Sequence, residues 1–300
     1  MQAIVFTELG GPQVLHLAEV PAPEPGPGQV RVRVEAAAVN GWDVKVRAAQ
    51  VPGMSPPRFP SVPGLEVAGV VDALGPDANG AAVGDRVVGF ADTGGYAELA
   101  LTSVFATVPP GLAPTDAVTL PVAAEAATRV LRELDVRRDE TLLVHGASGS
   151  VGELAVQLAV RAGARVIGTA SRARQDRVTA LGASATTYGP GLVDRVRELA
   201  PGGVDAVLDA SGAGVLPDSV TLRGGTDRIV TIADPAASGL GIPFSSTARR
   251  DAGELARVVR ALARHELTTT VGHLLPLAEA ARAHELVGGG HPGGKVVLVP

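Results

Sequence analysis

Cysteine is absent from this chain of 300 residues. Without thiols the protein can form no disulfide, no thiolate nucleophile and no cysteine-ligated metal site. Histidine is scarce, and no His-x-x-x-His pair places two imidazoles on one helical face. The histidines are His16, His145, His265, His273, His284 and His291. Because they are scattered along the chain, the sequence predicts no zinc site.

The chain also lacks long charged or apolar runs. Its formal net charge is -5, with no block of lysine and arginine, which argues against nucleic acid or an anionic membrane as a partner. No apolar run reaches transmembrane length, and residues 1–17 lack the pattern of a signal peptide, so we expect a cytoplasmic protein. Aromatic residues make up only 3% of a chain that is 46% hydrophobic. Alanine, valine and leucine must therefore build the core.

Residues 141–170 have the pattern of a β-strand, a glycine turn, an α-helix and a second strand. The turn contains three glycines with separate roles. Gly146 permits a sharp turn, Gly149 lets a pyrophosphate approach the backbone, and Gly152 lets the helix pack closely on the strand. The free N–H groups at the start of such a helix attract phosphate. The complete unit predicts a dinucleotide site, although the glycine spacing alone also fits an ordinary strand-to-helix turn.

Strands and helices continue to alternate after this unit, which predicts an α/β fold with a doubly wound parallel sheet. The expected strands are residues 141–145, 165–169, 185–188, 204–209 and 228–233. Ligands bind at the carboxyl ends of such strands. The glycine turn, Ser171, Ser211 and Ala233 should therefore line one crevice.

The first hundred residues predict a different domain. Short strand signals broken by glycine and proline indicate a small β-barrel-like domain. The proline-rich residues 51–63 should form either a plain surface loop or a flap beside a cleft. The apolar strand at 295–299 should return to this N-terminal domain.

The residues that follow the second strand of the nucleotide unit bear on the choice of cofactor. A site for NAD usually carries Asp or Glu there, to bind the adenosine 2′-hydroxyl. Here the chain reads Gly168-Thr169-Ala170-Ser171-Arg172, with further arginines at 174 and 177. Hydroxyl and cationic groups suit a 2′-phosphate, so the sequence favours NADPH. A solvated helix face is the alternative explanation for these arginines.

Several segments of the chain together carry a family resemblance. They are the P-G-x-E-x-x-G-x-V pattern at 63–71, residues 83–87 and 95–98, the glycine turn at 145–152, and residues 283–284 and 294–297. In combination they resemble the zinc-free quinone oxidoreductase branch of the medium-chain dehydrogenase/reductase superfamily. The resemblance implies a GroES-like β-barrel substrate domain over 1–115, completed by 270–300, and a dinucleotide-binding Rossmann domain over 116–269. It also implies a homodimer.

The same resemblance implies NADPH-dependent, zinc-independent reduction of quinones or α,β-unsaturated carbonyls. Residues 40–47 resemble the family segment beside the nicotinamide, which implies that Asn40 and Lys45 stabilise the developing oxyanion or enolate. For Lys45 a plain surface role is an equal alternative. Arg172 and Tyr188 match family positions that contact the 2′-phosphate. The full set of predicted cofactor-binding residues is Trp42, Asp43, Gly146, Ser148, Gly149, Ser150, Val151, Gly168, Thr169, Ser171, Arg172, Tyr188, Ser211 and Ala233.

Residues 120–128 depart from the family pattern. Ala126 and Thr128 replace a threonine and a tyrosine, and the acidic Glu125 stands among small residues. Because the replaced threonine faces the nicotinamide in the family, two alternatives to a quinone or enone reductase stay open. One is an enoyl or alkenal reductase on acyl-type substrates, and the other is a non-catalytic NADPH-binding redox sensor.

Overall fold

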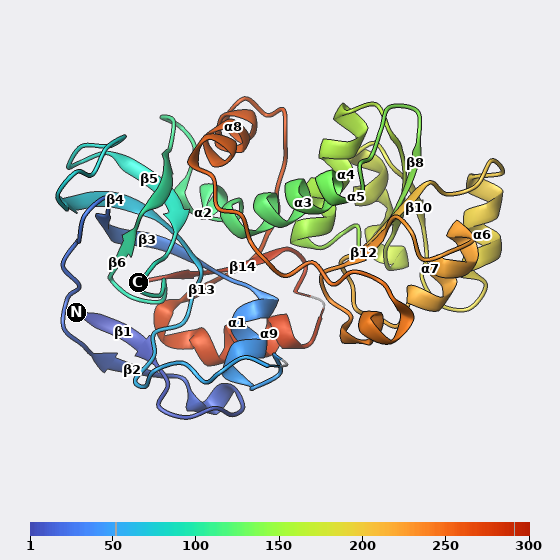
Figure 1. The fold of residues 1–300 in the computed structure, drawn as a ribbon. Coiled ribbons are helices and arrows are strands. Elements are labelled where there is room, and N and C mark those ends of the chain that lie inside the picture. The colour runs from blue at the N-terminus through green and yellow to red at the C-terminus, as the bar shows by residue number, and fades with distance from the viewer. Residues whose placement is uncertain (52, 291) are drawn as a thin grey trace. The chain divides into compact units, whose positions relative to one another are not determined.

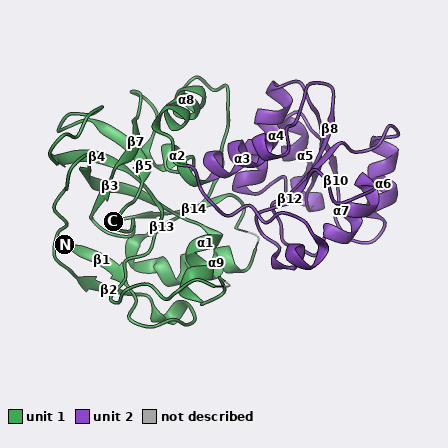
Figure 2. Cartoon of the chain, in the orientation of Figure 1, with its two compact units in different colours: residues 1–122, 250–300 green, residues 123–249 purple. Residues whose placement is uncertain are grey.

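The computed structural model describes residues 1–51, 53–290 and 292–300 (Figure 1). Pro52, in the proline-rich segment, and His291, one of the six histidines, lie outside the described residues. The chain forms two compact units, which Figure 2 colours separately. Unit 1 contains residues 1–122 and 250–300, and unit 2 contains residues 123–249.

The units differ from the predicted domain boundaries in two segments. Residues 116–122 and 250–269, which the sequence assigned to the nucleotide domain, belong to unit 1. The physical reason for the second segment is the packing of helix α8 (Ala252–Ala263) against strand β7 (Val104–Thr107). The buried side of α8 carries Leu255, Val258, Val259 and Leu262.

Unit 1 is built on a seven-stranded sheet with the order β13-β14-β3-β4-β5-β7, in which β6 also pairs with β3. A separate antiparallel pair is formed by β1 (Gln2–Val5) and β2 (His16–Glu19). The other strands are β3 (Val30–Val39), β4 (Glu66–Leu74), β5 (Arg86–Phe90), β6 (Leu99–Thr102), β13 (Val271–Pro276) and β14 (Lys295–Val299). The pairing of β14 with β3 confirms that the C-terminal strand returns to the N-terminal domain.

Helices close one side of this sheet. Helix α1 (Gly41–Arg47) follows β3 directly, and it packs against α9 (Ala280–Gly288), as Figure 1 shows. The core between them and the sheet contains Ile4, Val34, Tyr96 and Leu298. The unit also contains η1 (Pro12–Val14), α2 (Pro114–Ala117), the start of α3 (Pro121–Glu133) and η4 (Leu277–Glu279).

Unit 2 contains a five-stranded parallel sheet with the order β10-β9-β8-β11-β12, which confirms the predicted doubly wound sheet. Its strands are β8 (Thr141–His145), β9 (Arg165–Thr169), β10 (Ser184–Thr186), β11 (Ala206–Asp209) and β12 (Ile229–Thr231). Its other elements are α4 (Ser150–Arg161), η2 (Arg172–Arg174), α5 (Gln175–Ala180), α6 (Leu192–Leu199), α7 (Leu216–Arg223) and η3 (Pro235–Leu240). Among the described residues, no helix has the length and apolar character needed to cross a membrane.

The sheet of unit 2 is covered on both faces. Leu143, Ile167 and Val207 pack with residues of α6 and α7. Helix α4 packs against β8 and β9, and α5 packs against β10. This arrangement sends the carboxyl ends of β8, β9, β11 and β12 to a common edge.

Candidate functional site

The glycine turn of unit 2 has the geometry that its three glycines predict. Gly146 adopts a left-handed conformation with φ of +73°, which favours glycine. A Cβ on Gly152 would lie 2.1 Å from the carbonyl oxygen of Gly146, so only glycine lets α4 pack this closely on the turn. A Cβ on Gly149 would lie 3.3 Å from the same carbonyl oxygen, a tight contact but a much smaller overlap. Gly149 is therefore less crowded than Gly152.

Helix α4 begins immediately after this glycine. Gly149 is its N-cap, and the N–H of Glu153 donates to the carbonyl of Gly149 at 2.8 Å. The N–H groups of Ser150 and Val151 precede that first helical hydrogen bond, so they are available to an acceptor outside the helix. Ser148, also a predicted cofactor residue, is 8% exposed. The helix start thus offers backbone donors and a positive dipole end, which fit a diphosphate group.

The end of β9 contacts the glycine turn and stabilises it. The N–H of Gly146 donates to the Thr169 hydroxyl at 3.3 Å, and the N–H of Ala147 donates to the Thr169 carbonyl at 3.0 Å. A Cβ on Gly168 would lie 2.7 Å from the Cβ of Ala147. Gly168 and Thr169 therefore hold the glycine turn in place.

The ends of β11 and β12 lie beside the same turn. Asp209 Oδ1 accepts hydrogen bonds from the backbone N–H of Ser211 at 2.9 Å and from its hydroxyl at 2.8 Å. Gly146 neighbours Ser211, and Gly212 neighbours Ala233. The structure thus brings the glycine turn, Ser211 and Ala233 to one edge.

The segment that follows β9 contains a cation that has no partner among the residues the structure describes. Arg172 is exposed and forms no hydrogen bond or ion pair with any residue that the structure describes. Tyr188 is 47% exposed and follows β10, which pairs with β9 through Thr186 and Thr169. Arg177, by contrast, forms an ion pair with the buried Glu153 of α4. Of these side chains, Arg172 and Tyr188 are the ones open to a ligand at the adjacent strand ends.

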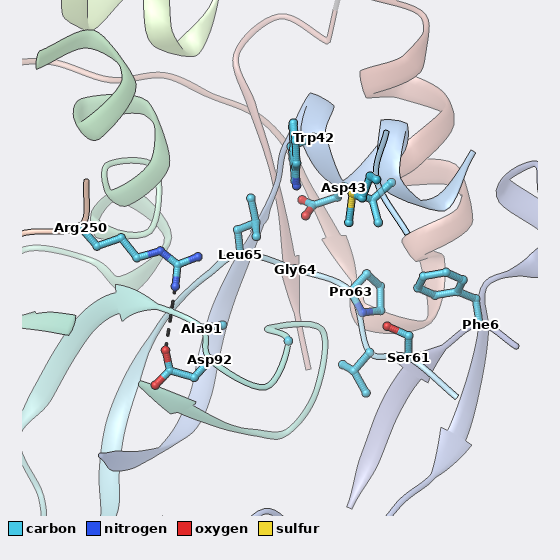
Figure 3. Close-up of a pocket in the computed structure, with 14 residues that line it drawn as sticks. Phe6, Trp42, Asp43, Ser61, Pro63, Gly64, Leu65, Ala91, Asp92 and Arg250 are labelled. Atoms are coloured by element: carbon cyan, nitrogen blue, oxygen red, sulfur yellow. Dashed lines mark ion pairs between the residues drawn. The ribbon is translucent and has the colours of Figure 1, made fainter. Parts of the chain in front are cut away.

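Unit 1 has a pocket of about 370 Å³ (Figure 3). Trp42 and Asp43 of α1 form part of its wall, and Figure 3 shows them side by side. On another wall, Arg250 pairs with Asp92 at 3.9 Å. Other lining residues are Phe6, Val46, Met54, Ser61, Val62, Pro63, Gly64, Leu65, Ala91 and Gly94. Part of the proline-rich segment 51–63 therefore borders this pocket.

A buried charged cluster lies behind Asn40. The ammonium group of Lys295 is 2.6 Å from Glu66 Oε1 and donates to Asn40 Oδ1 at 2.6 Å. Asn40 Nδ2 donates to Glu66 Oε1 at 2.9 Å. Glu66 Oε2 accepts from the backbone N–H of Val122 at 2.8 Å. The side-chain carbonyl oxygen and one amide hydrogen of Asn40 therefore bind the buried ion pair of Lys295 and Glu66.

The Asp43 carboxyl belongs to a second chain of hydrogen bonds. Its Oδ2 accepts from the backbone N–H of Asn40 at 2.8 Å and from the Tyr96 hydroxyl at 3.2 Å. His284 Nε2 lies 3.3 Å from the same hydroxyl, which can accept its N–H. Burial raises the pKa of Asp43 to about 7 and raises the pKa of Tyr96 well above its usual value. Burial also lowers the pKa of His284 to about 3, so this imidazole is neutral at physiological pH.

Two further residues from the sequence analysis have clear positions. Lys45 is half-buried on α1 but is not among the described residues that line the unit 1 pocket. Glu125, the acid in the divergent segment, pairs with Arg129 at 2.9 Å and accepts the N–H of Arg249 at 2.8 Å. Glu125 therefore has a structural role in fixing the segment that leaves unit 2.

Comparison with known proteins places this geometry in a family. The model described as "Alcohol dehydrogenase GroES-like domain" matches residues 26–110, and the model described as "Zinc-binding dehydrogenase" matches residues 181–298. The solved structure of a mycobacterial protein complexed with NADPH has a TM-score of 0.86 and 31% identity, with each chain covered completely. A solved structure named NAD-dependent alcohol dehydrogenase has a TM-score of 0.88 and 32% identity, again over both whole chains. The chain belongs to the medium-chain dehydrogenase/reductase superfamily.

Within this superfamily the chain is quinone oxidoreductase-like. It is 28% identical to the quinone oxidoreductase of Mus musculus over 100% of this chain and 98% of that protein. It is also 37% identical to the erythronolide synthase EryA2 of Saccharopolyspora erythraea over 64% of this chain. That match spans only 5% of the synthase, so the chain corresponds to a small part of that protein.

In this superfamily member, the described residues contain no group of three or more histidine and acidic side chains that could hold a metal ion.

The sequence alone did not identify all the partners that position the predicted site residues. Tyr96, His284 and Lys295 become visible only through contacts between residues far apart in the chain. Asp209 differs, because the acid that ends the fourth predicted strand lies two residues before Ser211 and was a local sequence signal.

Proposed function

We propose that this protein is an NADPH-dependent reductase that transfers a hydride to a quinone or to an α,β-unsaturated carbonyl compound. Membership of the superfamily supports a nicotinamide-dependent oxidoreductase. The observation that carries the choice of NADPH is the pair of Arg172 and Tyr188 at neighbouring strand ends, with Arg172 free of any described partner. A 2′-phosphate is a dianion that an unpaired guanidinium and a phenol can bind directly.

The residues of unit 2 fit the rest of such a cofactor. The N–H groups of Ser150 and Val151 would bind the diphosphate over Gly149, where no side chain obstructs the approach. Ser171, Ser211 and Ala233 would line the remaining strand ends. When bound, the cofactor supplies a hydride equivalent from its nicotinamide ring.

Unit 1 would supply the substrate pocket and the groups that respond to developing charge. On the family resemblance, Asn40 and Lys45 are proposed to stabilise the oxyanion of the reduced substrate, although neither is among the described residues that line the unit 1 pocket. A carboxamide has two N–H hydrogens, and the bond to Glu66 takes one of those on Asn40. Trp42 and Leu65 offer apolar surface for a flat ring. We also propose zinc independence, because the chain has no cysteine and the Lys295 ammonium already neutralises Glu66.

A second candidate function is the reduction of acyl-type enoyl substrates. The observation that favours it is the 37% identity to a segment of erythronolide synthase EryA2. The remaining alternative is an NADPH-binding sensor without turnover. A cytoplasmic homodimer is proposed on the family resemblance.

The test is NADPH oxidation, followed by absorbance, with a benzoquinone, a naphthoquinone, a simple enone and an enoyl thioester. Calorimetric titration with NADPH runs beside it. Turnover of the quinones or the enone supports the proposal, and turnover restricted to the enoyl thioester favours the acyl-type reductase. Tight NADPH binding without turnover of any of the four compounds contradicts the reductase and favours the sensor.

A further inference from the structure

The Asp43 carboxyl is the acidic group on the wall formed by helix α1 in the unit 1 pocket. It is 5% exposed, and it stands beside Trp42 in Figure 3. Both protein hydrogen bonds to this carboxyl go to Oδ2, from the N–H of Asn40 and the hydroxyl of Tyr96. Oδ1 forms no hydrogen bond with any described residue. The carboxyl is thus held by one oxygen, and the other is left for a ligand.

Charged and titratable groups face Asp43 from every element packed against it. Glu66 comes from β4, Lys295 from β14, Tyr96 from the segment before β6, His284 from α9, and Arg47 from α1 itself. Burial raises the pKa of Asp43 to about 7, and the charge of Glu66 adds to this effect. Lys295 and the two hydrogen bonds act in the opposite direction. His284 is neutral, because its pKa is lowered to about 3 by burial and by Arg47.

We propose that Asp43 is the proton donor to the substrate in this pocket, a role that rests on the proposed reductase function. Reduction of a quinone to a hydroquinone requires one hydride and one proton. The hydride brings both electrons, and negative charge develops on a carbonyl oxygen. The Oδ1–H bond of Asp43 then breaks and an O–H bond forms on that oxygen, which leaves a carboxylate. Water reprotonates Asp43 after the hydroquinone departs.

This assignment gives Asp43 a function that its neighbours do not share. Glu66 is occupied by Lys295 and the N–H of Val122, and Asp92 pairs with Arg250. Tyr96 is fully buried and reaches the site only through Asp43. Tyr96 is therefore a positioning residue, and Asp43 is the group that meets the substrate.

The kinetic test compares wild type with Asp43→Asn, which keeps an oxygen acceptor for Asn40 and Tyr96. We expect kcat for a benzoquinone to fall by about 100-fold or more, the usual size of a general-acid contribution. In the wild type, kcat should decline above about pH 7 as Asp43 ionises, and this decline should vanish in the variant. Tyr96→Phe removes a hydrogen bond that favours the carboxylate, so it should move the decline to higher pH.

A second readout needs neither cofactor nor turnover. Trp42 is the single tryptophan of the chain and lines the same pocket. Its fluorescence in the free protein should titrate with a midpoint near pH 7, and Asp43→Asn should abolish this step. Asp92→Asn is the matched control, because it changes another carboxyl of the same pocket and should leave the step in place.

The outcomes separate the two claims. Quinone turnover by the wild type with a large loss in Asp43→Asn supports the inference. Equal turnover by both proteins, or a fluorescence step that persists in Asp43→Asn, overturns the inference and leaves the reductase function intact. Absence of quinone turnover in a wild type that binds NADPH overturns the proposed function and the proton donor with it.

Discussion

Alanine at two glycines of the nucleotide turn should have different effects, a loss of stability at Gly152 and a loss of cofactor affinity at Gly149. In Gly152→Ala the new Cβ would lie 2.1 Å from the Gly146 carbonyl oxygen and 2.8 Å from Ala147 Cα, both backbone atoms. Backbone cannot rotate away as a side chain can, so α4 must shift. Overpacking of this kind costs about 1–3 kcal/mol, and we expect the upper end of that range. This corresponds to a fall in melting temperature of roughly 5–10 °C.

Gly149→Ala should cost less stability than Gly152→Ala and weaken cofactor binding. The backbone at Gly149 has φ of -84°, which any residue adopts, and its Cβ would lie 3.3 Å from the Gly146 carbonyl oxygen, a smaller overlap than the 2.1 Å at Gly152. The poorer N-cap and the smaller unfolded-state entropy of alanine offset one another to within about 1 kcal/mol. The methyl group would occupy the space that the diphosphate needs, so the Kd for NADPH should rise by about tenfold or more, an energy of about 1.4 kcal/mol.

The assays are thermal unfolding without ligand and calorimetric titration with NADPH, for wild type and both variants. An equal fall in melting temperature in Gly149→Ala and Gly152→Ala would contradict the difference in crowding at the two positions. NADPH binding by Gly149→Ala as tight as that of the wild type would contradict the placement of the diphosphate over Gly149.

Three further predictions concern named charges. Arg172→Ala should weaken NADPH binding about 10- to 100-fold and leave NADH binding unchanged, because the guanidinium meets only the 2′-phosphate; equal losses by calorimetry would contradict its role. Two hydrogen bonds from Arg228 lower the pKa of Glu140 to about 2 from an ordinary 4.5, so its stabilising effect is complete above about pH 4.5 and disappears as the pH falls toward 2. Urea unfolding at pH 7 and pH 3 should show this loss in the wild type and a smaller one in Glu140→Gln. Lys295→Met should cost about 3–5 kcal/mol in urea unfolding, because it leaves Glu66 buried without a counter-charge, and adding Glu66→Gln should restore part of it.

The nucleotide unit could be read from local sequence because its information is local. Strands 141–145 and 165–169 are confirmed without change of bounds, since each is a short apolar run on one side of the glycine turn and its helix. The third expected strand, 185–188, is instead Ser184–Thr186, which leaves Tyr188 beyond the strand and half exposed. Strand β10 ends at Thr186, which pairs with Thr169 of β9. The local sequence of one strand does not show which residues of another strand it pairs with.

The environment of Asp43 could not be read in the same way. Its partner Tyr96 lies 53 residues away along the chain, and the hydrogen bond from His284 to Tyr96 spans 188 residues. The sequence identifies Asp43 only through the segment 40–47 that resembles the family. The protonation of Asp43 depends on burial, which tertiary packing creates. Glu125 shows the converse, because an acid that looked disruptive among small residues is satisfied by Arg129 and the backbone of Arg249.

The most direct test of the central claim is the kcat/KM for a benzoquinone measured with NADPH and with NADH under the same conditions. We expect turnover with both reductants and a kcat/KM at least about tenfold higher with NADPH, because charge-assisted hydrogen bonds such as those of Arg172 to a phosphate contribute about 1.5–3 kcal/mol. Equal efficiency with NADH would contradict the assignment of Arg172 and Tyr188. No quinone reduction with either reductant would contradict the reductase itself.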